Sequence, residues 1–221
     1  ANTTGTFNTA LGSDALETII TSNHCTAVGC QALRLNTAAS NSAFGSRSME
    51  NNTSGSLNTA VGFDSLFSNT SGTNNTALGD DALKANETGQ FNTACGSGSL
   101  AANTGSFNTA VGRDSLTANT SGGELVAIGD NALAGNQTAN HNTAVGRSAG
   151  FATTTGSDNT FIGYVAGVAN ETGAENTAVG SHAFDAATTS ARCSAVGFEA
   201  LDHVTTGTEN SSLGYRAGNS I

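Results

Sequence analysis

The sequence contains no proline and no tryptophan, and aromatic residues make up only 5% of its 221 positions. Charged residues are also scarce, at 11%, whereas Ala, Gly, Ser, Thr and Asn dominate. A wide conventional core needs many large apolar side chains, so this composition excludes one. It leaves room for a thin coil with small residues inside.

Positive charge is the next shortage, because 7 basic residues face 17 acidic ones and the formal net charge is −10. The charges are spread thinly, without a basic patch or run. Such a chain repels nucleic acid and anionic lipid at long range, so neither is an expected partner. No apolar run is long enough to cross a bilayer, so we expect no membrane insertion in this segment.

What the chain does have is one pentapeptide, Asn108-Thr109-Ala110-Val111-Gly112, that returns in variant form from end to end. Its glycine recurs at Gly12, Gly29, Gly45, Gly62, Gly79, Gly96, Gly112, Gly129, Gly146, Gly163, Gly180, Gly197 and Gly214. Ten of the twelve intervals are 17 residues and two are 16. A period this short predicts an all-β parallel β-solenoid of thirteen coils, in which each coil contacts only its neighbours.

The array therefore forms a single repeat domain over residues 1–221. The sequence starts within a repeat and without Met, which indicates a segment of a longer fibre protein.

The column just before the glycine is apolar in every coil and mostly β-branched, which is typical of a short strand. We expect it to form the core of the coil, together with the Thr or Ser two residues earlier, which alternation places on the same face. The expected core residues are Leu11, Val28, Phe44, Val61, Leu78, Val111, Ile128, Val145, Ile162, Val179, Val196 and Leu213.

The alanine column between them then points to the opposite face. A solvent-exposed face has no physical reason to stay small and apolar in eleven of thirteen coils, so we expect it to pack against another copy of the chain. The expected interface residues are Ala10, Ala27, Ala43, Ala60, Ala77, Ala94, Ala110, Ala127, Ala144, Ala178 and Ala195. On this interpretation Ala110→Asp disrupts assembly more than Val111→Leu.

Two further kinds of column complete the coil. A second wall, mostly leucine, lies four residues after the glycine, and it changes to Gly150, Gly167 and Gly218 near the C-terminal end, where Phe151, Phe161 and Tyr164 are candidates to fill the space. Asparagine columns suit turns and coil-to-coil ladders.

Several turn asparagines also read Asn-x-Thr/Ser, as at Asn86-Glu87-Thr88 and Asn170-Glu171-Thr172. We interpret these as turn chemistry in preference to glycosylation, because Asn and Thr are abundant throughout the chain.

No catalytic, cofactor or metal constellation stands out from the repeat. His24, His141, His182 and His203 occupy different columns, without an acidic partner at a recurring metal-ligand offset. The acidic residues two after the glycine predict a broken stripe along the fibre, at Asp14, Asp64, Asp81 and Asp114. A calcium site there is conceivable, but the Gly-rich calcium-binding nonapeptide is absent. We expect no enzyme activity and no cofactor.

The four cysteines lack the close pairing of a metal site. Cys25 and Cys193 share a column but lie ten coils apart, or about 48 Å at ~4.8 Å per coil, so they cannot pair within one chain. We expect Cys25, Cys30, Cys95 and Cys193 to be free or buried small residues.

The repeated Asn-Thr-Ala-Val-Gly pattern, with Ala-Leu four residues later, resembles the head repeats of trimeric autotransporter adhesins. It is still closer to the Asn-Thr-Ala-x-Gly repeats of phage tail-fibre shafts, and the resemblance covers all thirteen coils. It implies a left-handed β-roll and a homotrimer in which the alanine faces lie near the three-fold axis. The adhesin coil is shorter, so the extra residues must enlarge a turn or add a short side.

The leading hypothesis is a structural shaft about 62 Å long at ~4.8 Å per coil, which holds a receptor-binding tip away from a cell or virion surface. Its expected location is extracellular, and its expected partners are copies of itself and a host surface glycan or receptor. One alternative is a module that binds glycans or an ice or mineral lattice through its repeated polar turns. Another is a filament subunit that stacks end to end through unpaired strand edges.

Overall fold

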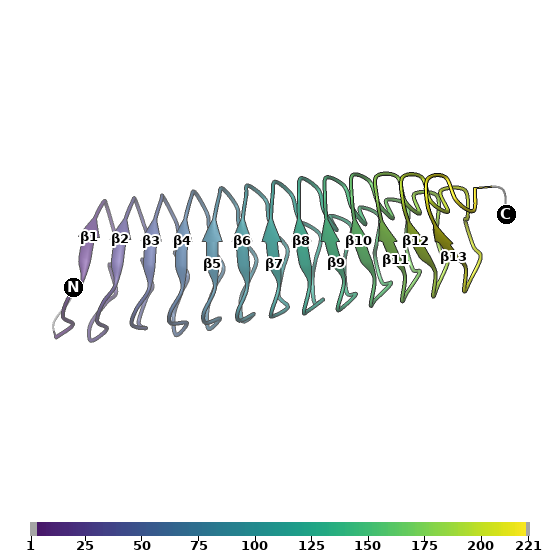
Figure 1. Cartoon of the computed structure of the whole chain (residues 1–221). Helices are drawn as coiled ribbons and strands as arrows, with labels where there is room; N and C mark the ends of the chain where they lie inside the picture. Colours follow the sequence, from purple (N-terminus) through teal and green to yellow (C-terminus); the bar gives the residue numbers. More distant parts are fainter. Residues whose placement is uncertain (1–3, 220–221) are drawn as a thin grey trace. The chain divides into compact units, whose positions relative to one another are not determined.

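The computed structural model describes residues 4–219, and every regular element in this range is a three-residue β-strand. The chain divides into two compact units, Ala1–Phe107 and Asn108–Ile221 (Figure 1). The first unit contains β1 (Thr9–Leu11), β2 (Thr26–Val28), β3 (Ser42–Phe44), β4 (Thr59–Val61), β5 (Thr76–Leu78) and β6 (Thr93–Cys95). The second contains β7 (Thr109–Val111), β8 (Val126–Ile128), β9 (Thr143–Val145), β10 (Thr160–Ile162), β11 (Thr177–Val179), β12 (Ser194–Val196) and β13 (Ser211–Leu213).

Within each unit the strands follow one another in sequence order and pair in parallel. Equivalent residues of successive coils lie opposite each other, so Ala60 pairs with Ala77 and Ala127 pairs with Ala144. One strand per coil, in register and about 17 residues apart, makes a parallel β-solenoid. The fold class predicted from the glycine spacing is therefore confirmed.

The glycine that follows each strand turns the chain at a corner that no other residue fits. Gly62 has a φ of +137°, a conformation that side chains rarely adopt. A Cβ atom built there would overlap the carbonyl group of Gly79 in the next coil. Both the backbone conformation and the close approach of the next coil require glycine.

The strand residues alternate as predicted, but the assignment of inside and outside was wrong. The alanine column points into the coil, where it is completely buried at Ala27, Ala43, Ala60, Ala77, Ala94, Ala110, Ala127, Ala144, Ala178 and Ala195. Only Ala10, in the first coil, is exposed. These alanines are therefore core residues of their own chain and are not available as an interface.

The predicted core column points outward. Its exposed members are Leu11, Phe44, Leu78, Val111, Ile128, Ile162, Val196 and Leu213, and its half-buried members are Val28, Val61, Val145 and Val179. Alternation shows which residues share a face, but it does not show which face is inside.

The narrow interior explains why alanine is the inward residue. The leucine column also points inward, and Leu33, Leu66, Leu83, Leu100, Leu116 and Leu133 are completely buried. The predicted second wall is thus confirmed. With leucine filling the space from one side, only a methyl group fits opposite it, because interiors pack without overlap.

One coil shows the same rule in reverse. Phe161 replaces alanine in β10 and is completely buried, and the facing leucine positions of two coils are Gly150 and Gly167. A Cβ atom at either glycine would overlap the Phe161 ring. Of the three aromatic residues expected to fill this space, Phe161 does so, whereas Phe151 and Tyr164 are exposed.

Two ladders of buried asparagine side chains satisfy the turns. In the first ladder, the Asn75 backbone N–H donates to Asn58 Oδ1 at 2.9 Å and Asn75 Nδ2 donates to the Gly89 carbonyl at 2.8 Å. In the second, Asn69 Nδ2 donates to Asn52 Oδ1 at 2.6 Å. The predicted ladders are present, and they supply the partners that buried amides need.

Asn86 and Asn170, the two sequon asparagines singled out in the sequence, belong to the second column and are completely buried. This burial favours the interpretation as turn chemistry.

Cysteine replaces asparagine twice in the first ladder and keeps its hydrogen bonds. The Cys193 backbone N–H donates to Asn176 Oδ1 at 3.0 Å, and Cys193 Sγ donates to the Gly207 carbonyl at 3.4 Å. Cys25 makes the corresponding bonds to Asn8 and Ala38. All four cysteines are free thiols, as predicted, and Cys25 and Cys193 are the two buried ones.

Candidate interaction surface

The first and third residues of every strand form one face of each unit, which we call the outward face. Its first row is mainly threonine, at Thr9, Thr26, Ser42, Thr59, Thr76, Thr93, Thr109, Val126, Thr143, Thr160, Thr177, Ser194 and Ser211. Its second row is the apolar column described above, with Cys95 as the thirteenth member. None of these positions is charged, although charged residues make up 11% of the chain.

A leading margin, formed by the residue two positions before each strand, borders the outward face. In the first unit and at its end this margin is partly aromatic or aliphatic, with Phe7, Leu57, Phe91 and Phe107 all at least half exposed. Phe91 and Phe107 stack with ring centroids 5.1 Å apart, and Phe7 stacks on His24 at 5.0 Å. The first unit therefore extends its apolar surface beyond the strands.

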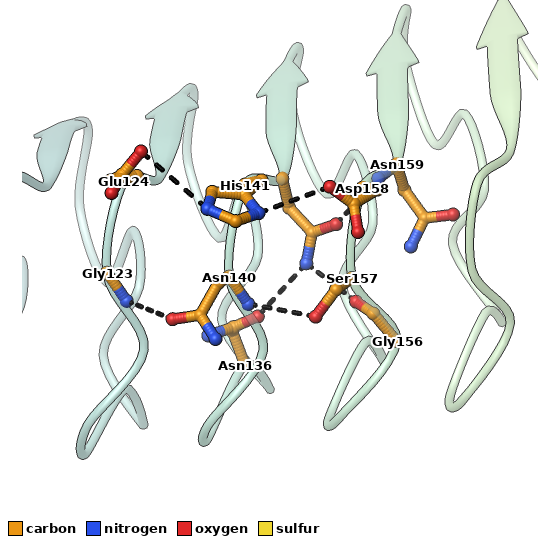
Figure 2. Close-up of polar contacts among 10 residues, drawn as sticks. Gly123, Glu124, Asn136, Asn140, His141, Gly156, Ser157, Asp158 and Asn159 are labelled. Carbon is orange, nitrogen blue, oxygen red and sulfur yellow. Dashed lines mark hydrogen bonds and ion pairs between the residues drawn. The ribbon is translucent and has the colours of Figure 1, made fainter.

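The same margin is charged in the second unit, at Glu124, His141, Asp158, Glu175, Arg192 and Glu209. Figure 2 shows His141 between two carboxylates, with Nε2 3.6 Å from Glu124 and Nδ1 3.2 Å from Asp158. Arg192 pairs with Glu209 at 3.0 Å. These groups are at least half exposed, so each pair contributes little stability by itself.

Polar side chains beneath this margin fix its backbone. In Figure 2 the Gly123 N–H donates to Asn140 Oδ1 at 2.8 Å, and the Asn140 N–H donates to Ser157 Oγ at 3.1 Å. Deeper in the coil, Asn142 Nδ2 donates to the Gly156 carbonyl at 2.7 Å. The charged side chains thus project from a turn that is hydrogen-bonded from coil to coil.

A trailing margin follows the corner glycine on the other side of the outward face. In the second unit Arg113 pairs with Asp130 at 3.0 Å, and Arg147 lies 5.8 Å from the Tyr164 ring. Phe198 and Tyr215 stack with centroids 5.6 Å apart. Each exposed aromatic ring here leans on a neighbour from another coil, and the row is a packing ladder.

The predicted acidic stripe is interrupted by cations. Asp64 is almost completely buried, where it accepts hydrogen bonds from Arg47 and lies 3.2 Å from Lys84 Nζ. Lys84 also donates to Asp81 at 2.9 Å, and these hydrogen bonds to Asp81 and Asp64 raise the pKa of Lys84 above its ordinary value. Asp114 pairs with Arg113 at 3.2 Å. The carboxylates thus serve as ion-pair partners.

The remaining titratable groups are also dispersed. Within residues 4–219, no three His, Cys, Asp or Glu side chains are grouped so that they could hold a metal ion. His182 lies 3.1 Å from Asp185, and a hydrogen bond to Asp202 raises the pKa of His203. A cavity of about 400 Å³ lies beside β1, where Asp14 and Glu17 are its only charged lining residues.

Sequence reasoning missed the exposed apolar row and the difference between the two leading margins. The signal for the row was Phe161, which stands in the alanine column and can fill the space left by Gly150 and Gly167 only if that column faces inward. The margin difference can be read directly, since the residue two before each strand changes from Phe91 and Phe107 to Glu124 and His141.

Comparison of the chain with protein-family models, curated proteins and solved structures finds no match. No helix in the described part of the chain is long and apolar enough to cross a membrane. The fold and its surface define the class of the protein as a parallel β-solenoid repeat protein.

Proposed function

We propose that this chain is the structural shaft of an extracellular appendage on a cell or virion, which holds a receptor-binding tip away from that surface. The observation that carries the proposal is the charge-free outward face, which repeats on every strand of a coil whose interior is filled by alanine, leucine and asparagine. A long, regular apolar face is typical of a component that is covered in an assembly.

A structural role also agrees with how the polar groups are used. The asparagine ladders, the corner glycines and the Asp64 cluster all join one coil to the next. Catalysis needs titratable groups that converge on a cavity, and the described residues offer none beyond the two carboxylates beside β1. We therefore propose a shaft without enzyme activity of its own, whose tip meets a host glycan or receptor.

We further propose that the shaft is a homotrimer. The apolar outward face supports association between copies, and the resemblance to adhesin heads and tail-fibre shafts supports the number three. Sedimentation equilibrium tests the number, because a mass near three times 21.8 kDa is expected for the isolated chain. A compact monomer at micromolar concentration would contradict the homotrimer.

The function itself is tested by locating the chain. Antibodies raised against it, carrying gold particles, should label thin appendages along their length in electron micrographs of the source cells or particles. Labelling confined to the cell interior, or to a surface without appendages, would overturn the proposal.

A second candidate is a lattice-binding module, and the structure moves its binding surface. The turn asparagines are buried, so the repeated turns cannot present them to a ligand. The threonine row is outward, with nine threonines and three serines among its thirteen positions. An ice-recrystallisation assay tests this candidate, since a monomer that inhibits recrystallisation and loses the effect on Thr76→Val substitution would favour it over the shaft.

A further inference from the structure

We infer that the outward face is where copies of this chain pack side by side, parallel and with equivalent coils at the same level. The inference rests on the proposed shaft and names both the partner and the orientation. The three steps of the argument concern the composition of the face, the identity of its partner and the direction of packing.

The composition of the outward face indicates that it is covered. Its 26 positions, the first and third residues of thirteen strands, include no charged residue and no proline. Charged residues and proline are the usual means by which exposed strands avoid association. In each unit the apolar row lies in one line, because successive strands pair in register.

The periodicity of the face indicates that its partner is another copy. The face offers one apolar side chain and one hydroxyl side chain per coil, and the same pair returns in nearly every strand. A partner that fits along a whole unit must repeat at the spacing of the coils. A second copy of this chain has that spacing automatically, which makes self-association the simplest match.

The leading margins favour the parallel direction. If the copies ran in opposite directions, the exposed Phe7, Leu57 and Phe91 of the first unit would face the charged margin of the second. The carboxylates of Glu124 and Asp158 would then lose water against aromatic rings without gaining a partner, which is unfavourable. Parallel copies place apolar margins with apolar margins and charged margins with charged ones.

Disulfide trapping tests both the face and the direction. The background variant carries Cys30→Ser and Cys95→Ser, which removes the two thiols that are not buried. Val28→Cys in β2 and Val196→Cys in β12 are then made separately, and diamide is added to oxidise thiols that meet. Thr88→Cys, on an exposed turn away from the outward face, is the matched control.

For parallel copies in register, Val28→Cys and Val196→Cys should each form a covalent dimer on their own, and Thr88→Cys should not. When the two variants are assembled together, mass spectrometry should find Val28→Cys chains joined only to each other. In a trimer one thiol per chain leaves a third of the chains uncrosslinked after full oxidation, so about two thirds should run as dimers, whereas a pure dimer should be fully crosslinked.

Two results would overturn the inference. Mixed dimers of Val28→Cys with Val196→Cys, without like dimers, would mean antiparallel packing. Absence of any crosslink, in samples that sediment as oligomers and keep their circular dichroism spectrum, would mean that another face associates. Neither result affects the gold labelling of appendages, so the shaft function and this inference can fail separately.

Discussion

The two compact units share one interior and differ at one border. In both, the inward column is alanine and the corner residue is glycine. At the leading margin, however, the first unit has the stacked pair of Phe91 and Phe107, whereas the second has His141 between Glu124 and Asp158. The interior is set by the geometry of the coil, which is the same everywhere, and the border is free to vary with whatever lies outside.

The largest expected effect tests whether the interior is common to both units. Ala60→Asp in the first unit and Ala110→Asp in the second each place a carboxylate in a site with no exposed surface and no partner. We expect each to destabilise its unit by more than about 4 kcal/mol, because a buried unpaired charge is among the costliest changes. Loss of the β circular dichroism signal at 25 °C checks this.

The neighbouring outward residues provide the control. Val61→Asp and Val111→Asp should leave the circular dichroism spectrum intact and lower the sedimenting mass, since these side chains are already partly exposed. A folded, associated Ala110→Asp variant would contradict the inward assignment of the alanine column.

The second prediction compares the coil of β10 with the regular coils. Phe161→Ala should destabilise the second unit by about 3–5 kcal/mol, because it leaves a cavity between Gly150 and Gly167. Thermal unfolding measures the effect, and Phe151→Ala, on an exposed phenylalanine, should change the melting temperature little.

A triple variant makes this prediction sharper. Phe161→Ala combined with Gly150→Leu and Gly167→Leu restores the regular pattern of the other coils, in which leucine occupies this position with a φ near +50°. It should recover most of the lost stability. Failure to recover would mean that packing against Phe161 is not the reason for the two glycines.

The interior could be predicted from the sequence except for its direction. The glycine spacing gave the solenoid, and strand alternation correctly separated Ala110 from Thr109 and Val111. What decides the inward face is volume, since leucine, two asparagines and a small Ala or Ser already occupy each coil and leave space for one methyl group. Hydrophobicity ranks valine above alanine for burial and therefore points the wrong way here.

The surface was less predictable for a different reason. Ion pairs such as Arg47 with Asp64 join residues 17 apart, so they follow from the coil period once it is known. The sequence alone did not show that Asp64 is buried, because burial depends on Arg47, Phe63 and Phe67, where the guanidinium lies 4.9 and 5.1 Å from the two rings.

The third prediction compares ion pairs of the two units. Asp64→Asn in the first unit should cost about 1–3 kcal/mol, because the nearly buried carboxylate is the shared partner of Arg47 and Lys84. Asp130→Asn in the second unit should cost less than about 1 kcal/mol, since its pair with Arg113 is exposed. Urea unfolding midpoints of the two variants measure the difference, and equal midpoints would show that Asp64 gains nothing from its burial.

The smallest effects distinguish the forces at the two leading margins. Phe91→Ala removes a stacked ring from Phe107 and should cost about 0.5–1.5 kcal/mol at any salt concentration, because stacking does not depend on ionic screening. Arg192→Gln removes an exposed ion pair with Glu209 and should cost less than about 1 kcal/mol at low salt, falling toward zero near 1 M salt, where the Debye length is about 3 Å. Urea midpoints at both salt concentrations measure the two costs. A salt-dependent cost for Phe91→Ala, or a salt-independent one for Arg192→Gln, would mean that the two margins differ in composition but not in the force that holds them.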